Sequence, residues 1–147
     1  SLSSGIEALP DYIDTLVIAG MGGDLIIDIL NKNKEKLNNI STLILAPNTN
    51  ASLVREVVNQ LGYKIANEKV IFEKHYYQII RFDKGETNYT KNDYLFGPIL
   101  RVEKSKEFLN MLNFEKSKLE RVLKEDLSEE KVKEIEEKIE EINHYED

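Results

Sequence analysis

The chain has 147 residues, of which 41% are hydrophobic and 32% charged, and its formal net charge is −7. This length is that of one domain, or of a small domain with an appendage. The absence of cysteine excludes disulfides, thiolate metal sites and cysteine nucleophiles, and the two histidines are too far apart in the sequence to suggest a metal site.

The sequence also argues against a membrane protein and a secreted protein. No apolar run approaches the roughly 20 residues of a membrane span. The first ten residues contain neither a basic residue nor the apolar core of a signal peptide. We therefore expect a cytoplasmic location. The negative net charge, taken alone, argues against a nucleic-acid binder.

The strongest local pattern is a short apolar run that leads into a glycine-rich turn. Leu16–Ala19 are four consecutive apolar residues, which predicts a strand covered on both faces, as in a parallel sheet. Gly20-Met21-Gly22-Gly23 follows and allows a tight turn. Apolar spacing then predicts a helix from Asp24 to about Lys36. Ligands of open α/β sheets bind at such strand ends, so this turn is a candidate site.

The next segments extend the same pattern and then change it. Thr42–Ala46 predicts a second buried strand, and Ala51–Leu61 a helix with Asn50 as its N-cap. Two further strands are predicted over 63–73 and 76–82. The connection between them is too short for a crossover helix, so they should form an antiparallel hairpin. An antiparallel strand that closes such a sheet is typical of class I methyltransferases.

The C-terminal third predicts a helical arm. Residues 1–83 form the α/β part, residues 84–98 are polar and predict a linker, and residues 99–147 carry two apolar helical stripes. Ser128 is the expected N-cap of the second helix. The short break between the stripes predicts an antiparallel, coiled-coil-like hairpin.

The two halves of this arm differ in charge. Residues 101–124 contain seven basic and four acidic residues, a net charge of +3, whereas residues 125–147 contain three and eleven, a net charge of −8. The basic half could face a polyanion. The alternative is that the two halves simply attract each other.

Two nucleotide-binding motifs are excluded at the glycine turn. A dinucleotide fold would need a glycine at Leu25 and an acidic residue after the next strand, which instead ends in Ala46-Pro47-Asn48. No Gly-Lys-Ser/Thr of a P-loop occurs in the chain. The turn could also serve only close packing between strand and helix.

Several segments together resemble one known family. They are the run from Asp14 to Leu30, the segment Leu43–Asn48, Leu53-Val54-Arg55, Leu61-Gly62-Tyr63, Glu68, Tyr76-Tyr77-Gln78-Ile79-Ile80 and Phe96–Leu100. In their order and spacing, they resemble the bacterial tRNA (adenine-22-N1)-methyltransferase family. The resemblance covers nearly the whole chain.

This resemblance implies a partial class I methyltransferase (Rossmann-like) sheet with a terminal antiparallel hairpin, followed by the helical arm. It implies transfer of a methyl group from S-adenosyl-L-methionine to N1 of an adenine in tRNA, with no metal. The enzyme would mainly position a flipped adenine in line with the methyl group. The residues implied at the catalytic position are Gly20, Met21, Gly22, Gly23 and Asn48.

Other residues are implied in binding. Gly20 and Gly22 would let the base approach the backbone, and Met21 could pack on its face. Asn48 could bond the base edge or the cofactor, or could be a turn residue only. The implied cofactor-binding residues are Ser4, Gly5, Ile6, Ala19 and Gly20. The implied tRNA-binding residues are Arg55, Lys116, Lys118 and Arg121, of which Arg55 could instead be a solvated helix charge.

The chain departs from this family at its N-terminal end. The family's first cofactor motif, a glycine-rich turn after its first strand, is missing, and Ser4 stands where an Asp or Asn is usual. We therefore expect weak or no cofactor binding and no activity from this chain alone. Leu16–Ala19 would then be an exposed edge strand, which predicts a homodimer or a domain swap.

Two other functions remain open from the sequence. The chain could be a non-catalytic interaction module whose helical hairpin binds a protein, or it could belong to a small-molecule methyltransferase. In either case the basic residues of the arm would not contact tRNA.

Overall fold

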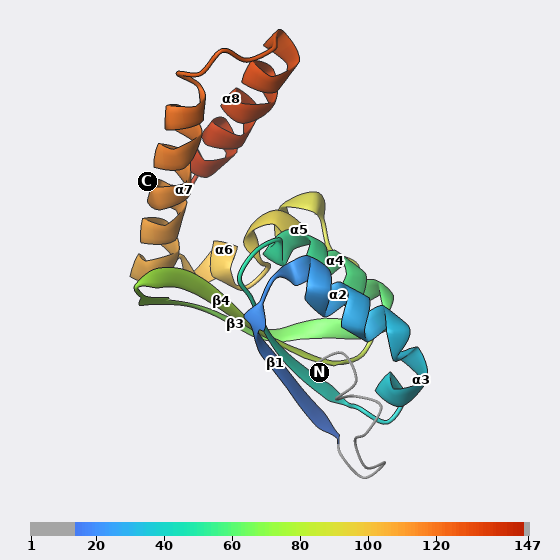
Figure 1. Cartoon of the computed structure of the whole chain (residues 1–147). Coiled ribbons are helices and arrows are strands. Elements are labelled where there is room, and N and C mark those ends of the chain that lie inside the picture. The colour runs from blue at the N-terminus through green and yellow to red at the C-terminus, as the bar shows by residue number, and fades with distance from the viewer. Residues whose placement is uncertain (1–13, 146–147) are drawn as a thin grey trace. The chain divides into compact units, whose positions relative to one another are not determined.

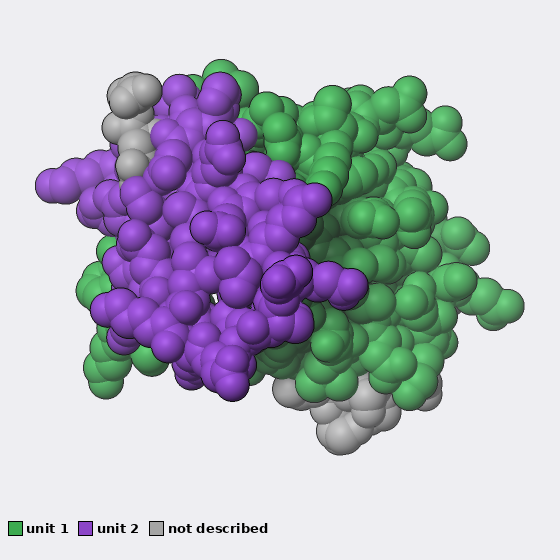
Figure 2. Space-filling model, turned by 90° about the horizontal axis from the view of Figure 1, so that it is seen from above, with its two compact units in different colours: residues 1–102 green, residues 103–147 purple. Residues whose placement is uncertain are grey.

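The computed structural model describes residues 14–145, and the chain forms two compact units, residues 1–102 and 103–147. Figure 2 shows the two units in separate colours. Among the described residues, no helix is both long and apolar enough to cross a bilayer. Within the same residues, no group of three or more acidic, histidine or cysteine side chains is placed to hold a metal ion.

Four strands form one mixed sheet in the first unit, in the order β1-β2-β4-β3 (Figure 1). β1 (Thr15–Met21) and β2 (Thr42–Pro47) are parallel. β4 (His75–Lys84) runs antiparallel to both β2 and β3 (Tyr63–Glu73). The predicted antiparallel hairpin is confirmed, and β4 lies between β2 and β3.

Helices cover one face of this sheet. α2 (Gly23–Lys32), α3 (Lys34–Leu37) and α4 (Ala51–Gln60) lie on the same side of the sheet in Figure 1. The apolar side chains of α2 and α4 recur at helical spacing, so they point together toward the strands. The fully buried members of this core include Ile26, Leu30, Leu43, Leu45, Val54, Val58, Ile80 and Phe82.

The helix expected over 24–36 is interrupted at Asn33. Its backbone leaves the helical region at φ −125°. The buried side-chain amide donates from Nδ2 to the carbonyl oxygen of Ile29 at 2.7 Å. Asparagine competes in this way with the regular backbone ladder, which separates α2 from α3.

The other face of β1 is open in the described part of the chain. Val17 is 62% exposed and Ala19 is exposed, whereas Ile18 is buried. The expectation that β1 is covered on both faces is therefore wrong for the described residues. β1 is also an edge strand among the described strands, so one side of its backbone has no partner strand there.

The segment over 84–98 is not a linker. It contains α5 (Lys91–Phe96), which begins with a capping box between Thr90 and Asp93 and packs against α4. Tyr94 donates its hydroxyl to Asn59 Oδ1 at 2.8 Å, and Tyr89 accepts from the backbone N–H of Ile65 at 2.8 Å. These contacts make the segment part of the first unit, which ends within α6 (Leu100–Glu103).

The second unit is the predicted helical hairpin. α7 (Lys106–Val122) and α8 (Glu129–Asn143) pack against each other, and Ser105 and Ser128 cap their N-termini with side-chain oxygens. The first turn of α7 meets the end of α8, where the Phe108 and Tyr145 rings lie 5.9 Å apart. The helices are therefore antiparallel (Figure 1).

We predict that stability at alkaline pH depends on Tyr63. Its buried hydroxyl lies 2.6 Å from the Ile40 carbonyl oxygen and 3.0 Å from that of Leu37, and burial raises its pKa to about 12. An unfolded tyrosine has a pKa near 10. The protonated Tyr63 hydroxyl therefore makes its full contribution to the free energy of unfolding below pH 10, and this contribution is lost as the pH rises toward 12.

Chemical denaturation between pH 9 and pH 12 should show this loss in the wild-type chain. Tyr63→Phe cannot ionise, so the decline specific to this residue should be absent from it. Equal pH profiles for the two proteins would contradict the prediction.

Candidate functional site

The candidate site lies where the parallel strands β1 and β2 end side by side. Their register pairs Ala19 with Ala46 and Met21 with Pro47. The glycine-rich segment Gly20–Gly23 at the end of β1 and the segment Asn48–Asn50 after β2 therefore lie at one edge of the sheet. In open α/β sheets this edge is the usual position of a ligand.

Backbone hydrogen bonds join the two loops. The N–H of Asn48 donates to the carbonyl oxygen of Met21 at 2.9 Å, and the N–H of Gly23 donates to that of Thr49 at 3.0 Å. The side chain of Asn50 donates from Nδ2 to Asp24 Oδ1 at 3.0 Å. Asn50 has φ +55° and makes no capping bond, so it occupies the expected N-cap position but connects the loops instead.

The glycines of the turn have different roles. A Cβ atom at Gly23 would lie 2.4 Å from the Thr49 carbonyl oxygen, so only glycine permits the contact between the loops. Gly20 has φ +77°, which favours glycine, and a Cβ atom there would meet none of the described residues within 4 Å. Close packing thus explains Gly23, while the space beside Gly20 is open to a ligand.

The remaining predicted residues of the site lie partly in the core and partly on the surface. Met21 is 7% exposed and belongs to the core, so its side chain is not presented to pack on a base, contrary to the expectation. Asn48 and Ala19 are exposed. The surface of the site is therefore formed by Ala19, Gly20 and Asn48, with Asp24 engaged by Asn50.

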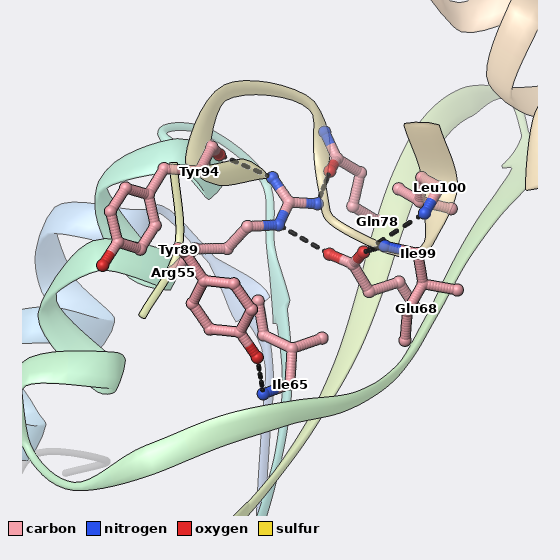
Figure 3. Close-up of polar contacts among 8 residues, drawn as sticks. All are labelled: Arg55, Ile65, Glu68, Gln78, Tyr89, Tyr94, Ile99 and Leu100. Carbon is pink, nitrogen blue, oxygen red and sulfur yellow. Dashed lines mark hydrogen bonds and ion pairs between the residues drawn. The ribbon is translucent and has the colours of Figure 1, made fainter. Parts of the chain in front are cut away.

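Arg55 is buried rather than available to a phosphate. Its side chain is fully buried, and all three guanidinium nitrogens donate within the first unit (Figure 3). Nε donates to Glu68 Oε2 at 2.6 Å, Nη2 to Gln78 Oε1 at 2.6 Å and Nη1 to the Tyr94 carbonyl oxygen at 3.2 Å. Both predictions for Arg55, that it contacts tRNA and that it is a solvated charge, are therefore wrong.

Glu68 completes this network on its other side. Its Oε1 accepts from the backbone N–H groups of Ile99 at 2.9 Å and Leu100 at 3.3 Å. Burial lowers the pKa of Arg55, and the Glu68 carboxylate opposes this by favouring the charged guanidinium. The pair thus links α4, β3 and β4 to the segment that follows α5.

A family model decides which family this chain represents. The model described as TrmK, tRNA (adenine(22)-N(1))-methyltransferase, matches residues 1–145. The chain belongs to the TrmK family. The tRNA (adenine(22)-N(1))-methyltransferase of Bacillus subtilis (strain 168) is 34% identical over 103 residues, which cover 65% of this chain and 43% of that relative.

Solved structures agree with the TrmK assignment and with a Rossmann-like fold. A Streptococcus agalactiae protein of the NADB-Rossmann superfamily has a TM-score of 0.92 and 31% identity, covering 98% of this chain and 65% of its own. A Streptococcus pneumoniae protein, solved with S-adenosyl-L-methionine, has a TM-score of 0.87 and 31% identity, covering 96% and 64%. The chain thus spans about 65% of these solved proteins and less than half of the Bacillus relative.

The remaining residues implied by the TrmK resemblance lie near the N-terminus and on α7. Ser4, Gly5 and Ile6 lie outside the described residues. On α7, Lys118 lies 3.7 Å from Glu115 and Arg121 donates to the Ser117 carbonyl oxygen at 3.4 Å. Lys118 and Arg121 share a helix face, whereas Lys116 is two residues from Lys118 and faces elsewhere. The three cations therefore do not form one patch.

We predict that removing the Glu68 carboxylate strongly destabilises this TrmK-family chain. Glu68→Ala leaves a buried arginine without its counter-charge and should lower the free energy of unfolding by about 3–5 kcal/mol. Glu68→Gln should cost less, because its amide oxygen can still accept from Ile99. Urea denaturation monitored by circular dichroism measures both effects.

The matched control is Asp28→Ala, which breaks the exposed ion pair with Lys32. That substitution should cost less than about 1 kcal/mol. Gly97→Ala is an independent test, since its Cβ would lie 2.6 Å from both Glu68 carboxylate oxygens. If the Glu68 and Gly97 variants lose no more free energy of unfolding than Asp28→Ala does, the buried network contributes little to stability.

Proposed function

We propose that this chain provides the adenine-facing part of an S-adenosyl-L-methionine-dependent methyltransferase that acts on N1 of an adenine in tRNA. The observation that carries the proposal is the open space beside Gly20, next to the exposed Asn48, at the joined ends of β1 and β2. Membership of the TrmK family supplies the reaction class.

The described residues suit a cofactor that approaches the carboxyl end of β1. Ala19 is exposed and Gly20 presents no side chain, so a bound group can contact the backbone there. When bound, S-adenosyl-L-methionine supplies an activated methyl group. The Streptococcus pneumoniae protein that was solved with this cofactor supports the assignment.

Positioning is the contribution expected of this chain. Adenine N1 carries a free lone pair, so no side chain has to remove a proton before the methyl group is transferred. Asp24 already accepts a hydrogen bond from Asn50, so it needs no role as a base. In this proposal Gly20 admits the base to the backbone, and the exposed Asn48 amide bonds the edge of the base and fixes N1 in line with the methyl group.

We predict methyl transfer to unmodified bulk tRNA by a longer form of this protein that spans the full length of its relatives. The 147-residue chain alone should transfer no methyl group, because it spans only part of those relatives. Labelled S-adenosyl-L-methionine provides the measurement. Transfer by both forms would show that the chain is sufficient, and transfer by neither would contradict the proposed function.

Variants of the longer form test the site itself. Asn48→Ala should lower kcat about 100-fold, the size of effect expected for loss of one positioned polar contact. The matched control is Asn39→Ala, an exposed asparagine in the turn before β2. Equal kcat for the two variants would remove Asn48 from the site.

We further propose that β1 pairs with a second copy of this chain. The position of β1 at the edge of the described sheet and the 62% exposure of Val17 support this. Sedimentation of the 147-residue chain should show a dimer, and Val17→Lys should shift it to a monomer. Val102→Lys, at a valine that is 77% exposed elsewhere in the first unit, is the control. A wild-type monomer at high concentration would contradict the proposal.

A further inference from the structure

The β3–β4 hairpin of the first unit carries aromatic side chains at its tip. They are Phe72 near the end of β3 and His75, Tyr76 and Tyr77 at the start of β4, and we call them the aromatic tip. Phe72 is 59% exposed, although phenylalanine is among the side chains most often buried. The methyl-transfer site proposed above makes no use of these rings.

The aromatic tip lies beyond the edge of the sheet that carries the candidate site. The register between β2 and β4 ends at the pair Leu45–Ile80, and the preceding part of β4 pairs with β3. Counted from that pair, Pro47 at the end of β2 is level with Gln78. Each strand residue advances about 3.3 Å, so Tyr76 lies about 7 Å beyond the end of β2. Figure 1 shows the hairpin extending past the end of β1.

The rings of the aromatic tip support one another in pairs on the two faces of the hairpin. Phe72 and Tyr76 are cross-strand partners, and their ring centroids lie 4.7 Å apart with an angle of 55° between the planes. His75 and Tyr77 flank Tyr76 in β4 and therefore lie on the other face, with centroids 6.4 Å apart. Such pairs hold their rings in place, so the exposed Phe72 ring is a preformed surface for a planar ligand.

The tip is basic, although the chain as a whole is acidic. Residues 69–77 contain two lysines, Lys69 and Lys74, and one acidic residue, Glu73, whereas the chain has a net charge of −7. Both lysines are exposed, and Lys74 forms the hairpin turn with φ +69°. Rings stack on nucleobases and ammonium groups meet phosphates, so aromatic side chains flanked by cations suit single-stranded RNA. This combination favours RNA over an apolar protein surface.

We propose that the aromatic tip stacks an unpaired base that neighbours the target adenine. β4 is the direct neighbour of β2 in the sheet, and adjacent strands lie about 4.8 Å apart, so the tip is within reach of the nucleotide next to the one at Asn48. Phe72 supplies the exposed ring, Tyr76 supports it, and Lys74 meets the phosphate. The proposal rests on the proposed function, because it takes tRNA as the substrate, and its surface lies wholly in the first unit.

The first test changes the ring at position 72 and keeps its bulk. A single-stranded RNA oligonucleotide that contains 2-aminopurine, whose fluorescence falls on stacking, is titrated with the 147-residue chain. The wild type and Phe72→Tyr should quench the probe, whereas Phe72→Leu should bind it about 10-fold more weakly. The matched control is Phe114→Leu, at an exposed ring of the second unit that Lys118 already covers. This control should behave like the wild type.

The second test measures methyl transfer to tRNA by the longer form of the protein. Phe72→Leu should raise KM for tRNA about 10-fold and leave kcat nearly unchanged, because the stack forms in the bound substrate and persists in the transition state. Phe72→Tyr should restore KM. Because Phe72 is exposed, thermal unfolding followed by circular dichroism should be the same for both variants, which separates lost stacking from lost folding.

The outcomes separate the stacking surface from the proposed function. If the longer form methylates tRNA but Phe72→Leu and Phe72→Tyr have equal KM, the stacking surface is overturned and the function stands, whether or not the probe is quenched. If the wild type fails to quench the probe, the stacking surface is also overturned. If only Phe72→Leu loses quenching and the longer form methylates no tRNA, RNA stacking at the tip is supported and the function is overturned.

Discussion

The first unit depends on one buried ion pair. Arg55 and Glu68 are both fully enclosed, and together they make hydrogen bonds to Gln78, Tyr94, Ile99 and Leu100. Two charges can be buried at acceptable cost only when each is paired and their remaining polar atoms are bonded. This requirement explains why Gly97 lacks a side chain, since any Cβ there would meet the pair.

The candidate site is built from backbone contacts around this frame. The loops after β1 and β2 are joined by main-chain hydrogen bonds, and Gly23 allows them to approach. Because the joined loops leave Gly20 uncovered, the position of the strand ends, rather than a reactive side chain, defines the site. In the function proposed above, this surface mainly orients the acceptor, while a cofactor supplies the electrophile.

Sequence patterns predicted much of the fold and only part of the site. The strands, the β3–β4 hairpin and the α7–α8 hairpin followed from apolar periodicity and short connections. The burial of Glu68 did not, because a register shift between Ile65 and Asn67 reverses which residues of β3 face inward. Alternation counted from Tyr63 would have placed Glu68 on the outer face.

The sequence by itself determined the four strands, the main helices between them, the C-terminal helical hairpin, the glycine-rich segment at the end of β1 and the resemblance to the family. These features depend on residues that are close in the sequence, because the spacing of apolar side chains sets helices and strands and the backbone freedom of glycine allows the turn. The tertiary structure alone decided that Arg55 is buried in an ion pair with Glu68 and that Met21 lies in the core. Each of these depends on contacts between residues distant in the chain, which local spacing does not encode.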